Sequence, residues 1–120
     1  ALASLFVVLT LLVMCMMPAP VQAAPPIADA GEDQTVVEKS YVTLDGSGSV
    51  DDVGIVNYTW IFFYGGINTT LYGMVNDSFR FMNPGVYNVT LNVTDVEGNY
   101  STDTVIITVL EKKVSVFVAY

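Results

Sequence analysis

The chain contains no histidine, and this absence excludes several kinds of active site. Ser-His-Asp and Cys-His arrangements need an imidazole as the general base, and His-ligated zinc sites need one as a ligand. Carboxylates are plentiful, but they cluster in turn segments, with no recognisable pocket-forming context around them. We therefore expect no catalytic residues and no enzymatic activity within this sequence.

Basic residues are almost as scarce as histidine. Four Lys and Arg stand against 12 Asp and Glu, so the formal net charge is -8. Such a polyanion repels phosphate backbones, and the only basic cluster along the sequence is the pair Lys112 and Lys113. We expect no nucleic-acid partner.

Cysteine occurs once, as Cys15, inside an apolar run that covers residues 1 to 17. The bulky Met14 before it does not fit a bacterial lipidation site, which favours an unmodified apolar thiol. The rest of the chain then has no disulfide. It must be stabilised by its core alone, which about a hundred residues of sandwich can supply.

Residues 1 to 23 carry no charge, and their apolar run is shorter than the span of about 20 residues that a bilayer needs. The segment ends in Val21-Gln22-Ala23, which predicts a signal peptide cleaved between Ala23 and Ala24. An initial Met and a basic segment are missing, which indicates a truncated start. An uncleaved membrane anchor is the alternative, and export predicts a secreted or cell-surface protein.

After a Pro-rich linker at residues 24 to 27, the sequence shows short strands separated by turn residues and no helical period. The clearest strand is 86 to 94, in which Tyr87, Val89, Leu91 and Val93 alternate with polar residues. Six further strands are expected at residues 35–37, 41–44, 56–63, 70–74, 78–82 and 102–110. The predicted fold is an all-β, seven-stranded sandwich.

A Trp on the third strand and a Tyr early in the sixth resemble the immunoglobulin-type sandwich. In that fold the Tyr stands two residues before a cysteine, and here Val89 takes that place. Apolar packing is therefore expected instead of an inter-sheet bridge. We predict a core of Trp60, Tyr87, Val89 and Leu91, in which the sixth strand packs onto the indole from the facing layer.

Five motifs carry a resemblance to a known family. They are A-D-A-G-E-D-Q-T-V (28–36), V-T-L-D-G-S-G-S (42–49), V-N-Y-T-W (56–60), P-G-V-Y-N-V-T-L-N-V-T-D (84–95) and G-N-Y-S-T-D-T-V (98–105). In this order they resemble the PKD domain, the polycystic-kidney-disease repeat of cell-surface and secreted proteins. The domain is placed at residues 28 to 110.

The resemblance implies an immunoglobulin-like module for spacing, adhesion or protein–protein interaction. Such modules often occur in tandem on archaeal surface-layer proteins or attached to secreted bacterial hydrolases. Its expected partners are other extracellular domains, surface proteins or glycans. The alternative function is an accessory domain of a secreted hydrolase that helps to bind polysaccharide or protein substrate.

The sequence departs from the family after Trp60, where relatives usually have D-F-G-D-G and this chain has I-F-F-Y-G-G. Ile61, Phe63 and Tyr64 then form an apolar contact patch, or the segment 68–74 folds back and covers them. A carbohydrate-binding module would need a flat row of exposed aromatics. The candidates for such a row are Tyr64, Tyr72 and Tyr100.

Asparagine usage is the most informative feature beyond the fold. Six of the seven asparagines stand in N-x-S/T, whereas the composition predicts about one such sequon by chance. These candidate glycosylation sites are Asn57, Asn68, Asn76, Asn88, Asn92 and Asn99. Alternation points the side chains of Asn57, Asn88 and Asn92 outward. A β-rich polar face could also show this pattern without any glycan.

The acidic turns raise the question of a metal. Residues 45 to 51 begin like a calcium loop, but Val50 and Val56 stand where an EF-hand needs Gly and Glu. Carboxylates from separate loops could still bind calcium, and the weak candidates are Asp29, Asp51, Asp52 and Asp95. The favoured reading is that turn carboxylates bind their own backbone amides, with no metal and no cofactor.

The tail 111–120 is apolar after Glu111-Lys112-Lys113. It is expected to be an eighth edge strand, a linker or the start of a further module. A membrane association would then come only from an uncleaved leader or from a C-terminal anchor beyond this sequence.

Overall fold

The structure is a computed structural model that describes residue 18 and residues 22–115. Cys15, most of the expected signal segment and the last five residues of the tail lie outside the described residues. Within the described part of the chain, no helix is long and apolar enough to cross a membrane. Residues 111–115 form no strand.

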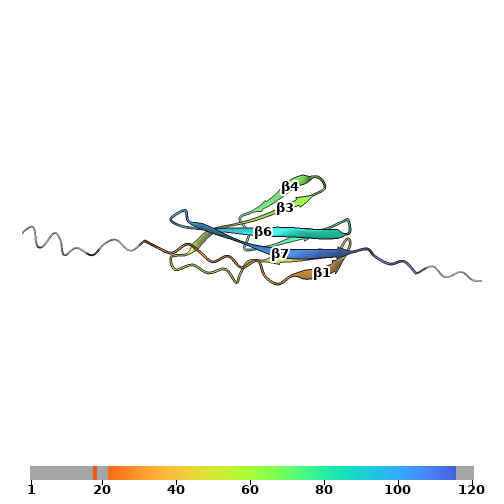
Figure 1. Cartoon of the computed structure of the whole chain (residues 1–120), viewed down its shortest axis with the longest axis horizontal. Coiled ribbons are helices and arrows are strands. Elements are labelled where there is room, and N and C mark those ends of the chain that lie inside the picture. Colours follow the sequence, from red (N-terminus) through yellow and green to blue (C-terminus); the bar gives the residue numbers. More distant parts are fainter. Residues whose placement is uncertain (1–17, 19–21, 116–120) are drawn as a thin grey trace, which may run out of the picture.

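Seven strands make up the described fold (Figure 1). They are β1 (Gln34–Val37), β2 (Tyr41–Asp45), β3 (Ile55–Tyr64), β4 (Ile67–Tyr72), β5 (Asn76–Arg80), β6 (Gly85–Asp95) and β7 (Tyr100–Leu110). The predicted all-β, seven-stranded sandwich is confirmed.

The strands form two layers of unequal size. One sheet has five strands in the order β1-β7-β6-β3-β4, and the other pairs β2 with β5. All pairings are antiparallel except that of β1, which runs parallel to β7. The long β6 lies in the middle of the larger sheet, and its alternating residues turn one apolar face to the core.

The core lies between the two sheets. Trp60, Val89 and Leu91 are fully buried, and Tyr87 is half-buried. The expectation that Trp60 faces β6 from the opposite layer is wrong, because β3 and β6 are neighbours in one sheet and Trp60 is paired with Leu91. The facing layer supplies Val42, Leu44 and Phe81 instead.

A close approach over the indole explains why a glycine follows β2. A Cβ at Gly46 would lie 3.0 Å from the carbonyl oxygen of Val75 and 3.3 Å from Cζ2 of Trp60. The indole Nε1–H donates to the carbonyl oxygen of Met74 at 3.2 Å. The buried ring therefore keeps its one polar group paired, as buried Trp side chains usually do.

An aromatic cluster fills the end of the core near the β3–β4 turn. Its rings belong to Phe62, Tyr64, Phe79, Phe81 and Tyr87, with neighbouring centroids 4.6 to 5.7 Å apart. The Tyr87 hydroxyl donates to the carbonyl oxygen of Asn83 at 2.8 Å, the bond of a tyrosine corner. Burial, with Tyr64 nearby, raises the pKa of Tyr87.

Two predicted strands are displaced by two or three residues at both ends. The strand expected at 70–74 is β4 at Ile67–Tyr72, because Gly65 and Gly66 both have positive φ and make a tight two-residue hairpin turn. The strand expected at 78–82 is β5 at Asn76–Arg80, whose pairing with β2 ends where Tyr41 meets Arg80.

Candidate functional site

The larger sheet turns one face to the core and leaves the other uncovered by β2 and β5. We call this second surface the outer face. Across it, Tyr72, Thr59, Asn92 and Thr102 are paired in one row from β4 to β7. Its side chains come from alternate positions of the strands: Thr35 and Val37; Asn57, Thr59, Ile61 and Phe63; Asn68, Thr70 and Tyr72; Val86, Asn88, Thr90, Asn92 and Thr94; Tyr100, Thr102, Thr104, Ile106 and Thr108.

No Lys, Arg, Asp or Glu is among these outer-face residues, although the chain carries a net charge of -8. Threonine and asparagine take their place and bond to one another. The hydroxyls of Thr90 and Thr104 lie 3.1 Å apart, and Thr94 Oγ1 donates to Asn92 Oδ1 at 3.4 Å. The outer face is therefore uncharged over β3, β6 and β7, and Thr and Asn supply most of its side chains.

Four of the six sequon asparagines lie on the outer face. Asn57, Asn68 and Asn88 are exposed, and Asn92 is partly exposed. The strand alternation that the sequence showed for Asn57, Asn88 and Asn92 agrees with this arrangement. The remaining two are elsewhere, Asn76 at the start of β5 and Asn99 in the β6–β7 turn.

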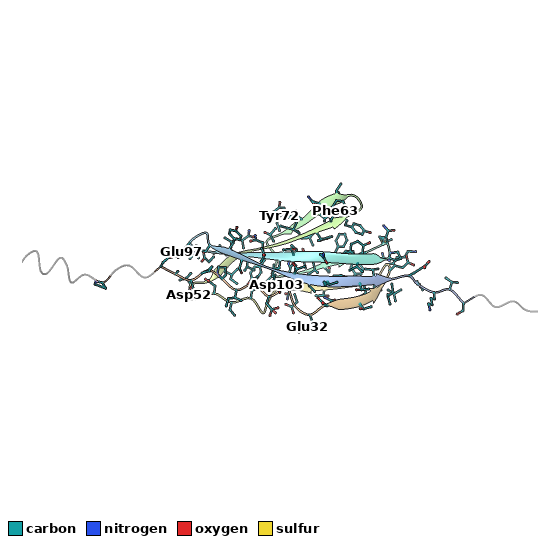
Figure 2. All side chains as sticks on the ribbon, viewed as in Figure 1. Glu32, Asp52, Phe63, Tyr72, Glu97 and Asp103 are labelled. Carbon is teal, nitrogen blue, oxygen red and sulfur yellow. The ribbon has the colours of Figure 1, made fainter. Side chains whose placement is uncertain are left out.

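Exposed apolar side chains interrupt the outer face along the β3–β4 hairpin. Phe63 is 63% exposed and Tyr72 is 74% exposed, and Figure 2 shows both on this hairpin. Ile61 is also exposed, whereas Tyr64 points into the aromatic cluster and its hydroxyl accepts the amide of Met82 at 2.9 Å. Because β4 pairs beside β3 in the same sheet, it does not fold over the apolar patch.

The inward position of Tyr64 changes the set of aromatic side chains that could bind carbohydrate. Tyr72 and Tyr100 are exposed on the outer face, but Tyr64 is not available to a ligand there. Phe63, which the sequence did not propose for this role, is the third exposed ring. The outward alternation of residues 57 to 63 is the signal that could have identified it.

The structure does not assemble the four metal candidates into a ligand set. Among the described residues, no group of three His, Cys, Asp or Glu side chains could hold an ion. Asp29 Oδ1 accepts the amide of Gly31 at 2.9 Å, and Asp51 Oδ2 accepts the amide of Gly54 at 2.7 Å. Asp52 is exposed. Calcium binding therefore remains a weak prediction without geometric support.

Asp95 is buried and organises the β6–β7 turn. Its Oδ1 accepts the amides of Glu97 at 2.8 Å and Asn99 at 2.9 Å, and its Oδ2 accepts Nδ2 of Asn99 at 3.0 Å. Burial works to raise the pKa of Asp95, but these hydrogen bonds outweigh it and the pKa lies below its ordinary value. Asp95 is a structural carboxylate.

Two proteins of known sequence are similar to this chain over about three quarters of its length. The human low-density lipoprotein receptor-related protein 11 is 34% identical over 90 residues, which cover 72% of this chain and 18% of that protein. The rat dyslexia-associated protein KIAA0319 homolog is 37% identical over 95 residues, which cover 72% of this chain and 9% of that protein. The chain thus spans less than a fifth of either relative.

Two solved structures share the fold. The solution structure of the PKD domain from the KIAA 1837 protein matches with a TM-score of 0.59 and 26% identity, covering 83% of this chain and 99% of that one. A second structure, from work on carbohydrate-binding modules of the β-sandwich superfamily, matches with a TM-score of 0.62 and 32% identity. That match covers 76% of this chain and 36% of the other.

A family model described as the K319L-like PKD domain matches residues 30–109. This range includes all seven strands except the last residue of β7. The sandwich, the tyrosine corner at Tyr87 and the buried Trp60 belong to the matched region. The chain therefore belongs to the K319L-like PKD domain family.

Proposed function

We propose that this chain is a non-catalytic extracellular module that spaces or connects other domains and carries N-linked glycans on its outer face. Domains of the PKD family are generally non-catalytic, and one relative is receptor-related by name. The absence of histidine is compatible with a role in binding or spacing rather than catalysis. Its partners are other extracellular domains or surface proteins.

The placement of the sequons is the observation that carries the proposal. Six sequons occur where about one is expected, but sequons scattered over both core and surface would not indicate glycosylation. Instead, Asn57, Asn68, Asn88 and Asn92 lie on one uncharged face that no other part of the described chain covers. A glycan attached there would displace no charged partner and no core side chain.

The course of the chain supports the spacer role. The described chain enters at one end of the sandwich and leaves at the opposite end (Figure 1). The strand β7 has 11 residues and so keeps the two ends about 35 Å apart. Domains attached at the two ends would therefore be held apart by the length of the sandwich.

The proposal is tested by expressing the sequence behind an intact leader in cells that perform N-glycosylation. We expect the secreted protein to lose mass when Asn57, Asn68, Asn88 and Asn92 are all changed to Gln. Asn83→Gln, at the one asparagine outside a sequon, is the matched control and should leave the mass unchanged apart from the substitution. Retention in the cytosol, or equal masses of the secreted forms, would contradict the proposal.

A second candidate function is supported by the exposed rings and by the match to a carbohydrate-binding-module structure. In this case Phe63, Tyr72 and Tyr100 would bind polysaccharide for an attached secreted hydrolase. Glycans at Asn68 and Asn92 would stand next to these rings, since Asn68 is paired with Phe63 and Asn92 lies in the row of Tyr72. Polysaccharide binding that is lost in Tyr72→Ala, with bare outer-face asparagines, would favour this alternative.

A further inference from the structure

All four basic residues of the chain lie around one concave site. A cavity of about 1070 Å³ is lined by Lys39, Arg80, Lys112 and Lys113, together with Glu38 and Glu111. We call it the basic cup. Its local charge is +2, and the other ten acidic residues of the chain lie outside it. Along the sequence only Lys112 and Lys113 are adjacent, so the fold creates this cluster.

Hydrogen bonds between side chains and the backbone fix the walls of the basic cup. The amide of Lys112 donates to Glu38 Oε1 at 3.0 Å, which ties the segment after β7 to the β1–β2 turn. Arg80 donates its Nε–H to the carbonyl oxygen of Lys39 at 2.6 Å, and its guanidinium carbon lies 5.6 Å from the ring centroid of Tyr41. The cations are thus positioned by three separate segments of the chain.

The opposite end of the sandwich is acidic. Asp51 and Asp52 lie in the loop before β3, and Glu97 lies in the β6–β7 turn. The pairing of Ile55 with Asp95, the last residue of β6, holds the two segments together. Figure 2 shows Asp52 and Glu97 at the end where the chain enters. We call this end the acidic pole. No Lys or Arg belongs to it, because all four line the basic cup.

The two ends are too far apart to neutralise each other within one molecule. They are separated by the length of β6 and β7, about 35 Å, whereas the Debye length is about 8 Å at physiological ionic strength. Each end is therefore left to attract an outside partner. The chain enters at the acidic pole and leaves at the basic cup. Two copies in series would therefore bring the basic cup of the first next to the acidic pole of the second.

We propose that the basic cup docks the acidic pole of a second copy of this chain, in a head-to-tail contact. This inference adds a partner to the proposed function but needs no glycan, so it stands or fails separately when the unglycosylated protein is used. Exposed ion pairs contribute little each, so the contact between free copies is weak. The contact becomes stronger where two copies are tethered to each other, because tethering raises their effective concentration.

Ionic strength should affect this contact in an unusual way. At about 0.01 M salt the Debye length is about 30 Å, and two molecules that each carry -8 repel one another as wholes. At about 0.15 M only the facing ends interact, and at about 1 M these ends are screened as well. We expect association to be strongest near physiological ionic strength and weaker on both sides of it.

The experiment is an NMR titration of the unglycosylated, isotope-labelled chain with unlabelled chain. Amide shifts are expected at Lys39 and Lys112 and at Asp52 and Glu97, with the salt dependence described above. Glu97→Lys alone and Lys112→Glu alone should each weaken association by about threefold or more. A mixture of these two variants should restore it, because the unchanged cup of the first variant can meet the unchanged pole of the second, and the two reversed charges are also opposite in sign.

Glu32→Lys is the control, because it makes the same charge change as Glu97→Lys at a position between the two ends (Figure 2). It should leave association within about twofold. An equal effect of Glu32→Lys, or no recovery in the mixture, would overturn the proposal. So would shifts confined to the outer face. Shifts of the cup amides with inorganic sulfate, but none with a second copy, would instead assign the basic cup to a small anion.

Discussion

At the scale of single residues, Trp60 has the largest fully buried side chain of the described core. It is fully buried, its Nε1–H is paired with Met74, and Gly46 lets the chain pass close over the ring. We predict that Trp60→Ala lowers the free energy of unfolding by about 3 to 5 kcal/mol, the range for deletion of a buried aromatic ring. Chemical denaturation with urea measures this loss.

Tyr72→Ala is the matched control for this variant, since it removes a ring that is 74% exposed. Its effect should stay within about 0.5 kcal/mol, as for other surface substitutions. A Trp60→Ala protein with the unfolding midpoint of the control would contradict the placement of the indole in the core.

At the scale of elements, Asp95 connects the end of β6 to the turn before β7. Because the pKa of the folded carboxyl lies below 3.8, the ionised form stabilises the fold above that pH, and this contribution is lost as the pH falls through the folded pKa. We predict that Asp95→Asn lowers the melting temperature near pH 7 and that the difference from the parent narrows below about pH 4.

Thermal melts from pH 2 to 7 give this comparison directly. Asp52→Asn makes the same chemical change on an exposed side chain and should melt like the parent at every pH. A difference between Asp95→Asn and the parent that is constant from pH 7 to pH 2 would show that the ionised carboxylate does not hold the turn.

The elements also show how far the sequence could predict this fold. Alternation predicted both faces of β3 and β6 because a side-chain period of two leaves each residue only one side. It could not predict which strands pair, and so Trp60 was placed in the wrong layer. The bounds of β4 depend on the Gly65-Gly66 turn, and those of β5 depend on its pairing with β2. The alternation of apolar and polar residues does not predict either of these contacts.

At the scale of the whole molecule, the two ends of the sandwich differ in charge. The outer face has none, one end is acidic and the other holds every basic side chain. The sequence predicted the outward asparagines because they lie on regular strands. It did not predict the basic cup, since Lys39, Arg80 and Lys112 are brought together only by contacts such as that between Lys112 and Glu38.

The glycan-bearing outer face is the central claim, and site-resolved mass spectrometry of intact glycopeptides from the secreted protein tests it most directly. We predict glycans on Asn57, Asn88 and Asn92, whose side chains point away from the core. Asn99 should be bare, because its Nδ2 is held by the buried carboxylate of Asp95. Bare asparagines at 57, 88 and 92 in a secreted protein would contradict the claim.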